Sequence, residues 1–314
     1  MWNTKITKLL DIDYPIIQGA MAYISDAALV SAVCAAGGTG VLATGRVEID
    51  YVREQIRAVK DATKKSFGVN LMLQSPNKDD VAQVCIDEKV PFVTIGAGNP
   101  VPFIEPLQAH GIKVIPVVPN VKLAKRVQEK GADALVIEGM EAGGHDGKLT
   151  LMALMENVIP EVEIPVIAAG GIADGRAIAA ALVMGAEGVQ IGSRFLLADE
   201  CHILPIIKET IMKAVDTDSV VTGFTTKDTV RGLKNKWSDR FLEMERTGAT
   251  QAELDAAAVG TTYKALAEGD IENGFILCGM SLHRLTKTQP TAEIMEELVS
   301  ETEARLGTAA GRIK

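Results

Sequence analysis

Short apolar runs alternate with amphipathic stretches from the N-terminus to about residue 200. The apolar runs have the length of buried strands, and the stretches between them have the period and length of helices. Eight strands are predicted, at residues 14–18, 39–43, 67–71, 92–95, 113–117, 134–138, 165–168 and 188–191. Helices are predicted between them at 26–36, 49–63, 78–88, 121–130 and 174–184, and Asp26 and Asp174 are suited to the N-cap positions.

Eight such strand–helix units are typical of an α/β protein with a (β/α)8 TIM barrel. A doubly wound sheet is the alternative, but that fold more often carries a GxGxxG turn after its first strand. Here the first strand is followed by Gly19-Ala20-Met21-Ala22, which lacks this pattern. The barrel is therefore the favoured fold.

The pattern changes after the eighth strand. Residues 201–287 are helical in character and show no convincing strand alternation, and a final amphipathic run at 292–306 is suited to the last barrel helix. We therefore expect a barrel of residues 1–200 plus 288–314, with a mostly helical substrate or lid insertion at 201–287. An insertion at this point lies over the carboxyl ends of the strands, where barrel active sites are found.

Composition narrows the functional classes. Hydrophobic residues make up 47% of the chain, aromatic residues only 4%, and the net charge is −9, which argues against a general nucleic-acid binder. The four cysteines have no CxxC spacing, so neither a disulfide framework nor a metal site is predicted. The N-terminus lacks the apolar region of a signal peptide, and no apolar run reaches membrane-spanning length, so a cytoplasmic protein is expected.

Glycine-rich loops follow the last two predicted strands. Gly170 and Gly171 come after the seventh strand, and Gly192 and Ser193 come after the eighth. Backbone N–H groups of these two loops form the usual phosphate site of the fold, so a phosphate-bearing ligand is predicted. The alternative is that the glycines only make tight turns.

A second candidate site is the loop at residues 138–147, which follows the sixth strand and holds Glu138 and His145. Histidine is suited to proton transfer near neutral pH and can donate a hydrogen bond to developing negative charge. We therefore predict that His145 is catalytic, against the alternative of a surface histidine in a mobile loop. Glu138 is expected to bind a cofactor or to pair with a neighbouring cation.

Basic residues gather in the insertion, at Lys227, Arg231, Lys234, Lys236 and Arg240. On a protein of net negative charge, this cluster is either a solvated helix face or a docking surface for an acidic protein or a phosphate group.

Several segments together resemble the nitronate monooxygenase superfamily of FMN-binding barrels. They are residues 15–21, 68–70, 138–145, 168–172 and 190–195, and they span most of the chain. The EAGGH sequence that ends at His145 is the most specific of these motifs. Together with residues 230–235, it most resembles the FMN-dependent enoyl-[acyl-carrier-protein] reductases (enoyl-ACP reductase II).

The resemblance implies roles for individual residues. Gly19, Ala20 and Met21 line the flavin ring, and Asn70 and Glu138 hydrogen-bond to the cofactor. The remaining implied cofactor contacts are the backbone of Gly143 and a phosphate site of Gly170, Gly171, Gly192 and Ser193, flanked by Gln190. His145 corresponds to the catalytic histidine, whereas Asp146 lies outside the shared motif and receives no role.

The implied reaction is the reduction of trans-2-enoyl-ACP by NADH or NADPH, the last step of fatty-acid elongation. The implied cofactor is FMN, with a monovalent cation as a further expectation. The implied partner is an acyl carrier protein that bears the enoyl thioester, and a homodimer is expected. Two alternatives stay open: a nitronate monooxygenase that oxidises nitroalkanes with FMN and O₂, and a non-catalytic protein that binds a flavin or phosphate ligand.

Overall fold

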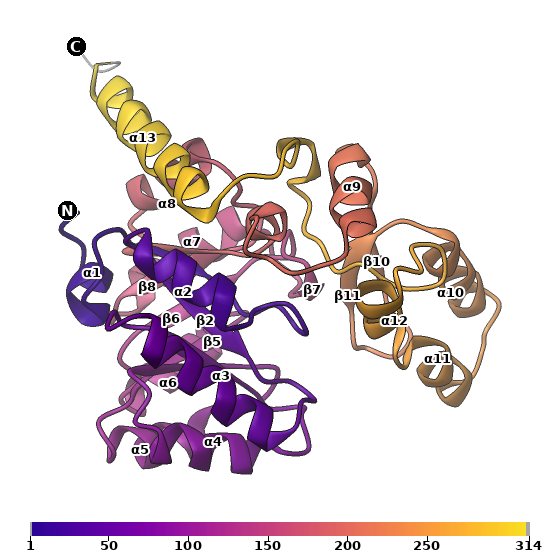
Figure 1. Ribbon diagram of the computed structural model, residues 1–314, viewed down its shortest axis with the longest axis horizontal. Coiled ribbons are helices and arrows are strands. Elements are labelled where there is room, and N and C mark those ends of the chain that lie inside the picture. Colours follow the sequence, from indigo (N-terminus) through magenta and orange to yellow (C-terminus); the bar gives the residue numbers. More distant parts are fainter. Residues whose placement is uncertain (1, 312–314) are drawn as a thin grey trace.

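A closed barrel of eight parallel strands forms the larger part of the molecule (Figure 1). The computed structural model describes residues 2–311. The barrel strands are β1 (Ile16–Gln18), β2 (Thr39–Ala43), β3 (Gly68–Met72), β4 (Phe92–Gly96), β5 (Lys113–Val118), β6 (Leu135–Glu138), β8 (Val166–Ala169) and β9 (Gly188–Ile191). Because β9 pairs in parallel with β1, with Ile16 opposite Val189, the sheet has no open edge. The predicted TIM barrel is confirmed.

Helices surround the barrel, and two of them, at Val101–Gln108 and Leu151–Val158, lie outside the ranges that the sequence predicts. The helices are α2 (Ala27–Ala35), α3 (Ile49–Ala62), α4 (Lys78–Asp87), α5 (Val101–Gln108), α6 (Val121–Glu129), α7 (Leu151–Val158), α8 (Gly175–Val183) and α13 (Thr291–Ala310). The two expected N-caps are confirmed: Asp26 accepts a hydrogen bond from Leu29 N at 3.1 Å, and Asp174 accepts one from Ala177 N at the same distance. Each cap satisfies a backbone N–H that the first helical turn leaves without a partner.

The barrel interior is filled at its amino end, which leaves the site at the carboxyl end. Inward-facing side chains such as Ile17, Phe92 and Ile167 form one buried cluster. The N-terminal helix α1 (Lys5–Leu10) adds Ile6 and Leu10 to the same cluster and so closes the amino end of the barrel. A cavity lies at the other end, where the strands finish.

The segment between β9 and α13 differs from the prediction in one respect. It contains the helices α9 (Pro205–Lys213), α10 (Lys236–Arg246), α11 (Gln251–Ala258) and α12 (Thr261–Glu268), but also the strands β10 (Ser219–Thr222) and β11 (Val230–Leu233). These strands form an antiparallel sheet that is completed by β7 (Gly144–His145) from the barrel loop. The expectation that this segment lacks strands is therefore wrong.

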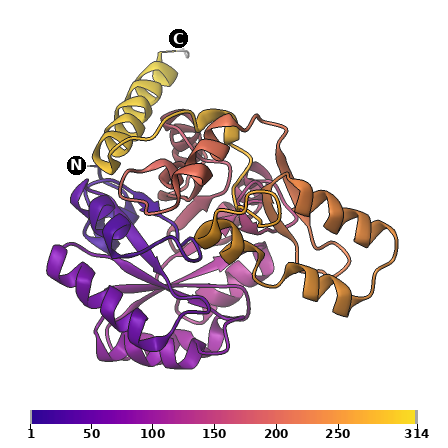
Figure 2. The same cartoon turned by 45° about the vertical axis from the view of Figure 1, so that its right-hand side comes forward.

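This inserted segment lies to one side of the barrel (Figures 1 and 2). It has a small apolar core of its own, in which the rings of Phe241 and Phe275 pack on Trp237 with centroid distances of 5.0 and 4.7 Å. Helix α12 meets the barrel where the Tyr263 ring lies edge-on to the ring of Tyr23, with a centroid distance of 6.1 Å. Helix α12 therefore borders the mouth of the barrel. The division into two domains at residues 201 and 287 stays a proposal.

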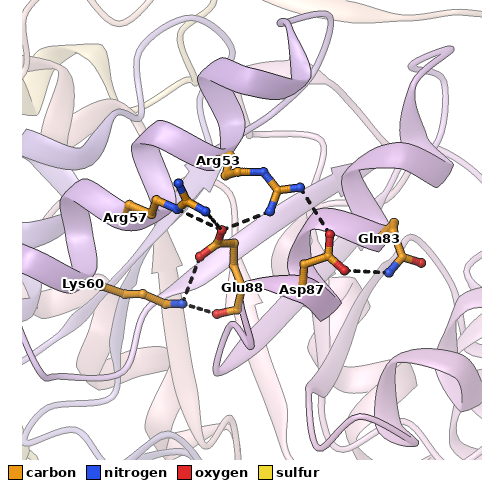
Figure 3. Close-up of polar contacts among 6 residues, drawn as sticks. All are labelled: Arg53, Arg57, Lys60, Gln83, Asp87 and Glu88. Carbon is orange, nitrogen blue, oxygen red and sulfur yellow. Dashed lines mark hydrogen bonds and ion pairs between the residues drawn. The ribbon is translucent and has the colours of Figure 1, made fainter.

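An ion-pair network joins α3 to the end of α4 on the barrel flank (Figure 3). The nearly buried Glu88 carboxylate lies 3.0 Å from Arg53 and 2.8 Å from Arg57, and Lys60 adds a third positive charge at 3.5 Å. Burial alone raises the pKa of Glu88, but the hydrogen bonds from Arg57 and Arg53 outweigh it and hold the pKa below its usual value. This network fixes two neighbouring barrel helices to each other.

No helix in residues 2–311 is both long enough and apolar enough to span a bilayer.

Candidate functional site

A cavity of about 460 Å³ lies at the carboxyl ends of the barrel strands. Its volume is within the range of small-molecule and cofactor sites. All twelve residues to which the sequence assigns a role line this one cavity: Gly19, Ala20, Met21, Asn70, Glu138, Gly143, His145, Gly170, Gly171, Gln190, Gly192 and Ser193. The barrel thus brings together residues that lie up to 174 positions apart (19 to 193) in the chain.

One wall of the cavity is made by the glycine loops after β8 and β9. Gly170 and Gly171 have positive φ angles of 95° and 71°, which side chains rarely adopt, and a Cβ at Gly170 would lie 2.9 Å from Gly139 O. At Gly192 an added Cβ would meet only Met21, with its sulfur at 3.8 Å. The space beside Gly192 is therefore open, and the backbone there can approach a ligand.

The chain segment that returns from the insertion supports this wall. Gly279 N donates a hydrogen bond to Ser193 Oγ at 2.9 Å, and Ser281 Oγ donates one to Gly171 O at 2.7 Å. Both Gly279 and Ser281 also line the cavity. No sequence pattern points to these two residues, because they lie in an irregular segment with no motif.

The first strands make a second wall. The Gly19 backbone packs so close to Gln190 that a Cβ at Gly19 would lie 2.9 Å from Gln190 Cγ. The Asn70 side-chain N–H donates to Thr94 Oγ1 at 3.0 Å, which fixes the direction of its amide at the end of β3. Both Met21, which follows β1, and Asn70, in β3, line the cavity, so the barrel sets their positions.

Glu138 lies at the end of β6 and lines the cavity. Burial raises the pKa of its carboxyl to about 7, and the negative charge of Asp146 contributes to the rise. Across the described part of the chain, no ion pair joins Glu138 to a cation, so the expected alternative of a neighbouring cation finds no support. Near neutral pH this carboxyl can either donate or accept a hydrogen bond to a ligand.

His145 projects from the short strand β7 and remains partly accessible at the cavity, with 42% of its side chain exposed. Its Nε2 lies 3.4 Å from the Asp228 carboxylate, which belongs to the loop between β10 and β11. The inserted segment therefore contributes a charged partner to the histidine. Sequence spacing could not reveal this contact, because the two residues are 83 positions apart (145 to 228).

The expected basic cluster does not form one surface. Arg231 lies in β11 and is buried with only 6% of its side chain exposed, where it faces Asp146. Lys236 pairs with Glu272 at 2.7 Å, and Arg240 donates to Asn273 at 2.9 Å. Both interpretations of the cluster, a solvated helix face and a docking surface, are therefore wrong for Arg231. It lies in a strand, where successive side chains point to opposite faces, and its own side chain points to the buried face.

The four cysteines are buried and free, in agreement with the sequence. Burial raises the pKa of the Cys278 thiol to about 11, so it is not a reactive thiolate near neutral pH. Within residues 2–311, no group of three or more His, Cys, Asp and Glu side chains is arranged to hold a metal ion.

Comparison with known proteins gives the site its context. The family model described as nitronate monooxygenase matches residues 3–86 and 80–301. Among solved structures, FabK from Thermotoga maritima is 42% identical, with a TM-score of 0.97 and full coverage of both chains. A nitroalkane oxidase from Streptomyces ansochromogenes is 28% identical, with a TM-score of 0.85 and coverage of 97% of this chain and 99% of that one.

A curated relative extends the comparison to thioester chemistry. The (3aS,4S,5R,7aS)-5-hydroxy-7a-methyl-1-oxo-octahydro-1H-indene-4-carboxyl-CoA dehydrogenase of Mycobacterium tuberculosis is 31% identical, and the match covers 99% of each chain. Since both the family model and this relative match nearly the whole length, the chain belongs to the nitronate monooxygenase family.

Proposed function

We propose that this protein is an FMN-dependent enoyl-acyl carrier protein reductase that uses NADH or NADPH. One observation carries the proposal: His145, Glu138 and the glycine loops line a single cavity in a chain that matches FabK, an enoyl-ACP reductase II, over its full length at 42% identity. The EAGGH loop and residues 230–235, which indicate the reductases within the family, lie next to each other in the fold.

The residues present fit FMN. The open space beside Gly192 and the backbone of Gly170, Gly171 and Ser193 suit a phosphate group, because backbone N–H groups and small side chains allow close approach. The Asn70 amide, held by its contact with Thr94, and the carboxyl of Glu138, whose pKa is about 7, supply hydrogen-bonding groups for the ring edge. When bound, FMN supplies the hydride chemistry of the reaction.

The chain's own contribution to the reaction centres on His145. Reduction of the enoyl thioester adds a hydride to the β-carbon and a proton to the α-carbon, and negative charge develops on the thioester oxygen between the two events. We infer that His145 hydrogen-bonds that oxygen or delivers the proton, and that Asp228, whose carboxylate lies 3.4 Å from Nε2, orients the imidazole.

The inserted segment suits a substrate larger than a nitroalkane. Thr262 and Leu266 of α12 line the cavity together with Leu277, so the segment adds an apolar surface to the barrel mouth. A relative that acts on a carboxyl-CoA compound is consistent with a thioester substrate. We infer that an acyl carrier protein presents the enoyl chain at this mouth. The homodimer, the monovalent cation and the cytoplasmic location stay predictions.

Nitronate monooxygenase is the second candidate, because the family model and the Streptomyces ansochromogenes nitroalkane oxidase both match. In that reaction His145 removes a proton from the nitroalkane, and O₂ is the oxidant. The same cavity residues serve both activities, so the geometry of the barrel end alone does not separate them.

The decisive experiment measures NADH and NADPH oxidation by the FMN-loaded protein without oxygen, with crotonyl-ACP or crotonyl-CoA as the acceptor. The proposal expects thioester-dependent oxidation that yields the saturated thioester. Oxygen consumption on a nitroalkane, together with no thioester reduction, would establish the second candidate instead. FMN binding with neither activity would leave a flavin-binding protein.

A further inference from the structure

The strand β11 of the inserted segment holds the backbone of the His145 loop. Strands β7 and β11 are neighbours (Figure 1), and in the sheet register Val230 lies opposite His145 and Arg231 lies opposite Gly144. The pairing of the two strands continues for one more residue, since Asp146 N donates a hydrogen bond to Thr229 O at 3.2 Å. The position of His145 is therefore set by a strand that is not part of the barrel.

The buried guanidinium of Arg231 connects both ends of this loop. Its Nε donates to Met140 O at 2.8 Å, at the start of the loop, and an Nη lies 3.8 Å from the Asp146 carboxylate, at the end. A second Nη donates to Ser219 Oγ at 2.9 Å, which links the group to β10. One side chain thus spans the segment that carries His145, and its planar fork fixes the direction of each contact.

The Asp146 carboxylate is buried at a cost in desolvation free energy. Only 3% of its side chain is exposed, and one oxygen, Oδ1, has no hydrogen-bond partner within the described residues. Asp146 also lines the cavity, close enough to Glu138 for its charge to raise the pKa of that carboxyl. A buried charge pair is weak as a source of stability, because desolvation opposes the attraction between the charges. A role in the site explains the pair better.

We propose that Arg231 is a positioning residue, which holds the loop between Met140 and Asp146 so that His145 meets the substrate. The inference rests on the proposed function for the identity of the reaction, but not for the order of the loop. Asp146 balances the charge of Arg231, and Glu141 and Glu138 are the other charged groups near the pair. The proposal requires no contact between the reacting atoms and either Arg231 or Asp146.

The test compares Arg231→Met with the matched control Arg240→Met, which removes an exposed arginine from the same segment. Hydrogen–deuterium exchange is measured over residues 139–147, with and without FMN. We expect faster exchange in Arg231→Met and the wild-type rate in the control. Because small displacements of a catalytic group cost about 10²-fold in rate, we also expect kcat to fall about 10²-fold with KM and the FMN Kd near wild type.

The double variant Arg231→Met/Asp146→Asn separates positioning from charge balance. Removing both charges restores stability, but the hydrogen bond to Met140 O stays absent, so kcat stays low. Full recovery of kcat would show that Arg231 only neutralises Asp146, and it would overturn the proposal. If Arg231→Met does not fold, Arg231→Lys, which keeps the charge and loses the fork, must still show faster loop exchange and a reduced kcat.

Failure of this inference is distinguishable from failure of the proposed function. If wild-type protein reduces no enoyl thioester, the proposed function fails, while the exchange rates still test the loop. If wild-type protein does reduce it, and both Arg231→Met and Arg231→Lys keep wild-type exchange and kcat, the positioning role is overturned alone.

Discussion

At Gly192 a single methyl group tests the proposed FMN site without disturbing the fold. Its backbone has φ −106° and ψ −77°, and an added Cβ lies 3.8 Å from Met21 Sδ, an ordinary van der Waals distance. Alanine in a tolerated conformation restricts the unfolded chain, so Gly192→Ala should change the free energy of unfolding of the FMN-free protein by about +0.4 to +1 kcal/mol. The folded protein is therefore expected to accept the substitution.

FMN binding is expected to respond differently, because the methyl group enters the space that we assign to the phosphate. Loss of one hydrogen bond to a charged group costs about 1.5–3 kcal/mol, which weakens binding by about 10–100-fold. Titration of the FMN-free protein, followed by flavin fluorescence, gives the Kd. Thermal unfolding of the same preparation gives the stability.

Gly248→Ala is the matched control. Gly248 has a φ of 81°, and an added Cβ there meets nothing within 4 Å among the described residues. The substitution therefore carries the cost of the left-handed conformation, about 1–2 kcal/mol, without filling the cavity. Wild-type FMN affinity in Gly192→Ala would refute the placement of the phosphate. A loss of stability equal to that of Gly248→Ala would refute the argument that Gly192 tolerates a side chain.

Three further outcomes follow from the site and the barrel flank. His145→Ala should lower kcat by about 10²–10³-fold with unchanged FMN affinity. Wild-type kcat in a variant whose FMN site is fully loaded would contradict the catalytic role of His145. The pKa of Glu138 is raised from 4.5 to about 7, so the stability that it contributes is present below pH 4.5 and is lost as the pH rises through 7. Over this pH range the melting temperature of the FMN-free protein should therefore fall more in the wild type than in Glu138→Gln. Parallel pH profiles of the two proteins would contradict the raised pKa. Glu88→Gln should lower the melting temperature by about 2–4 °C, whereas Glu54→Gln, which removes an exposed carboxylate from α3, should not. Since the pKa of Glu88 is lowered, its contribution is present above its ordinary value of 4.5 and is lost as the pH falls, so an equal effect at pH 4 and pH 7 would refute it.

The barrel could be predicted from the sequence because its strands are buried on both faces. Residues 135–137 and Val166–Ala169, for example, are apolar without interruption, and a helix of ordinary length separates each such run from the next. The carboxyl ends of such strands meet at one end of the barrel. Residues at those ends therefore had to gather, and the twelve predicted site residues line one cavity.

The strands β10 and β11 could not be predicted in the same way. Each has only four residues, and β11 contains Arg231 and Gly232 within its span. Their sheet is completed by a two-residue strand of the His145 loop, so its formation depends on a tertiary contact rather than on a local pattern. No sequence signal separates the buried Arg231 from its exposed basic neighbours.

The site is therefore shared between the barrel and the inserted segment, which contacts it at two places. At the histidine side, β11 pairs with β7 and Arg231 spans the loop. At the glycine loops, Gly279 N of the returning segment donates to Ser193 Oγ. The same segment packs so closely on the His145 loop that a Cβ at Gly143 would lie 2.7 Å from the Cys278 backbone carbonyl carbon. Because Met280 N also donates to Glu141 O at 2.9 Å, the His145 loop and the glycine loops are held by one continuous piece of chain. The barrel supplies the position of the cavity, but the insertion determines the geometry with which the histidine faces it.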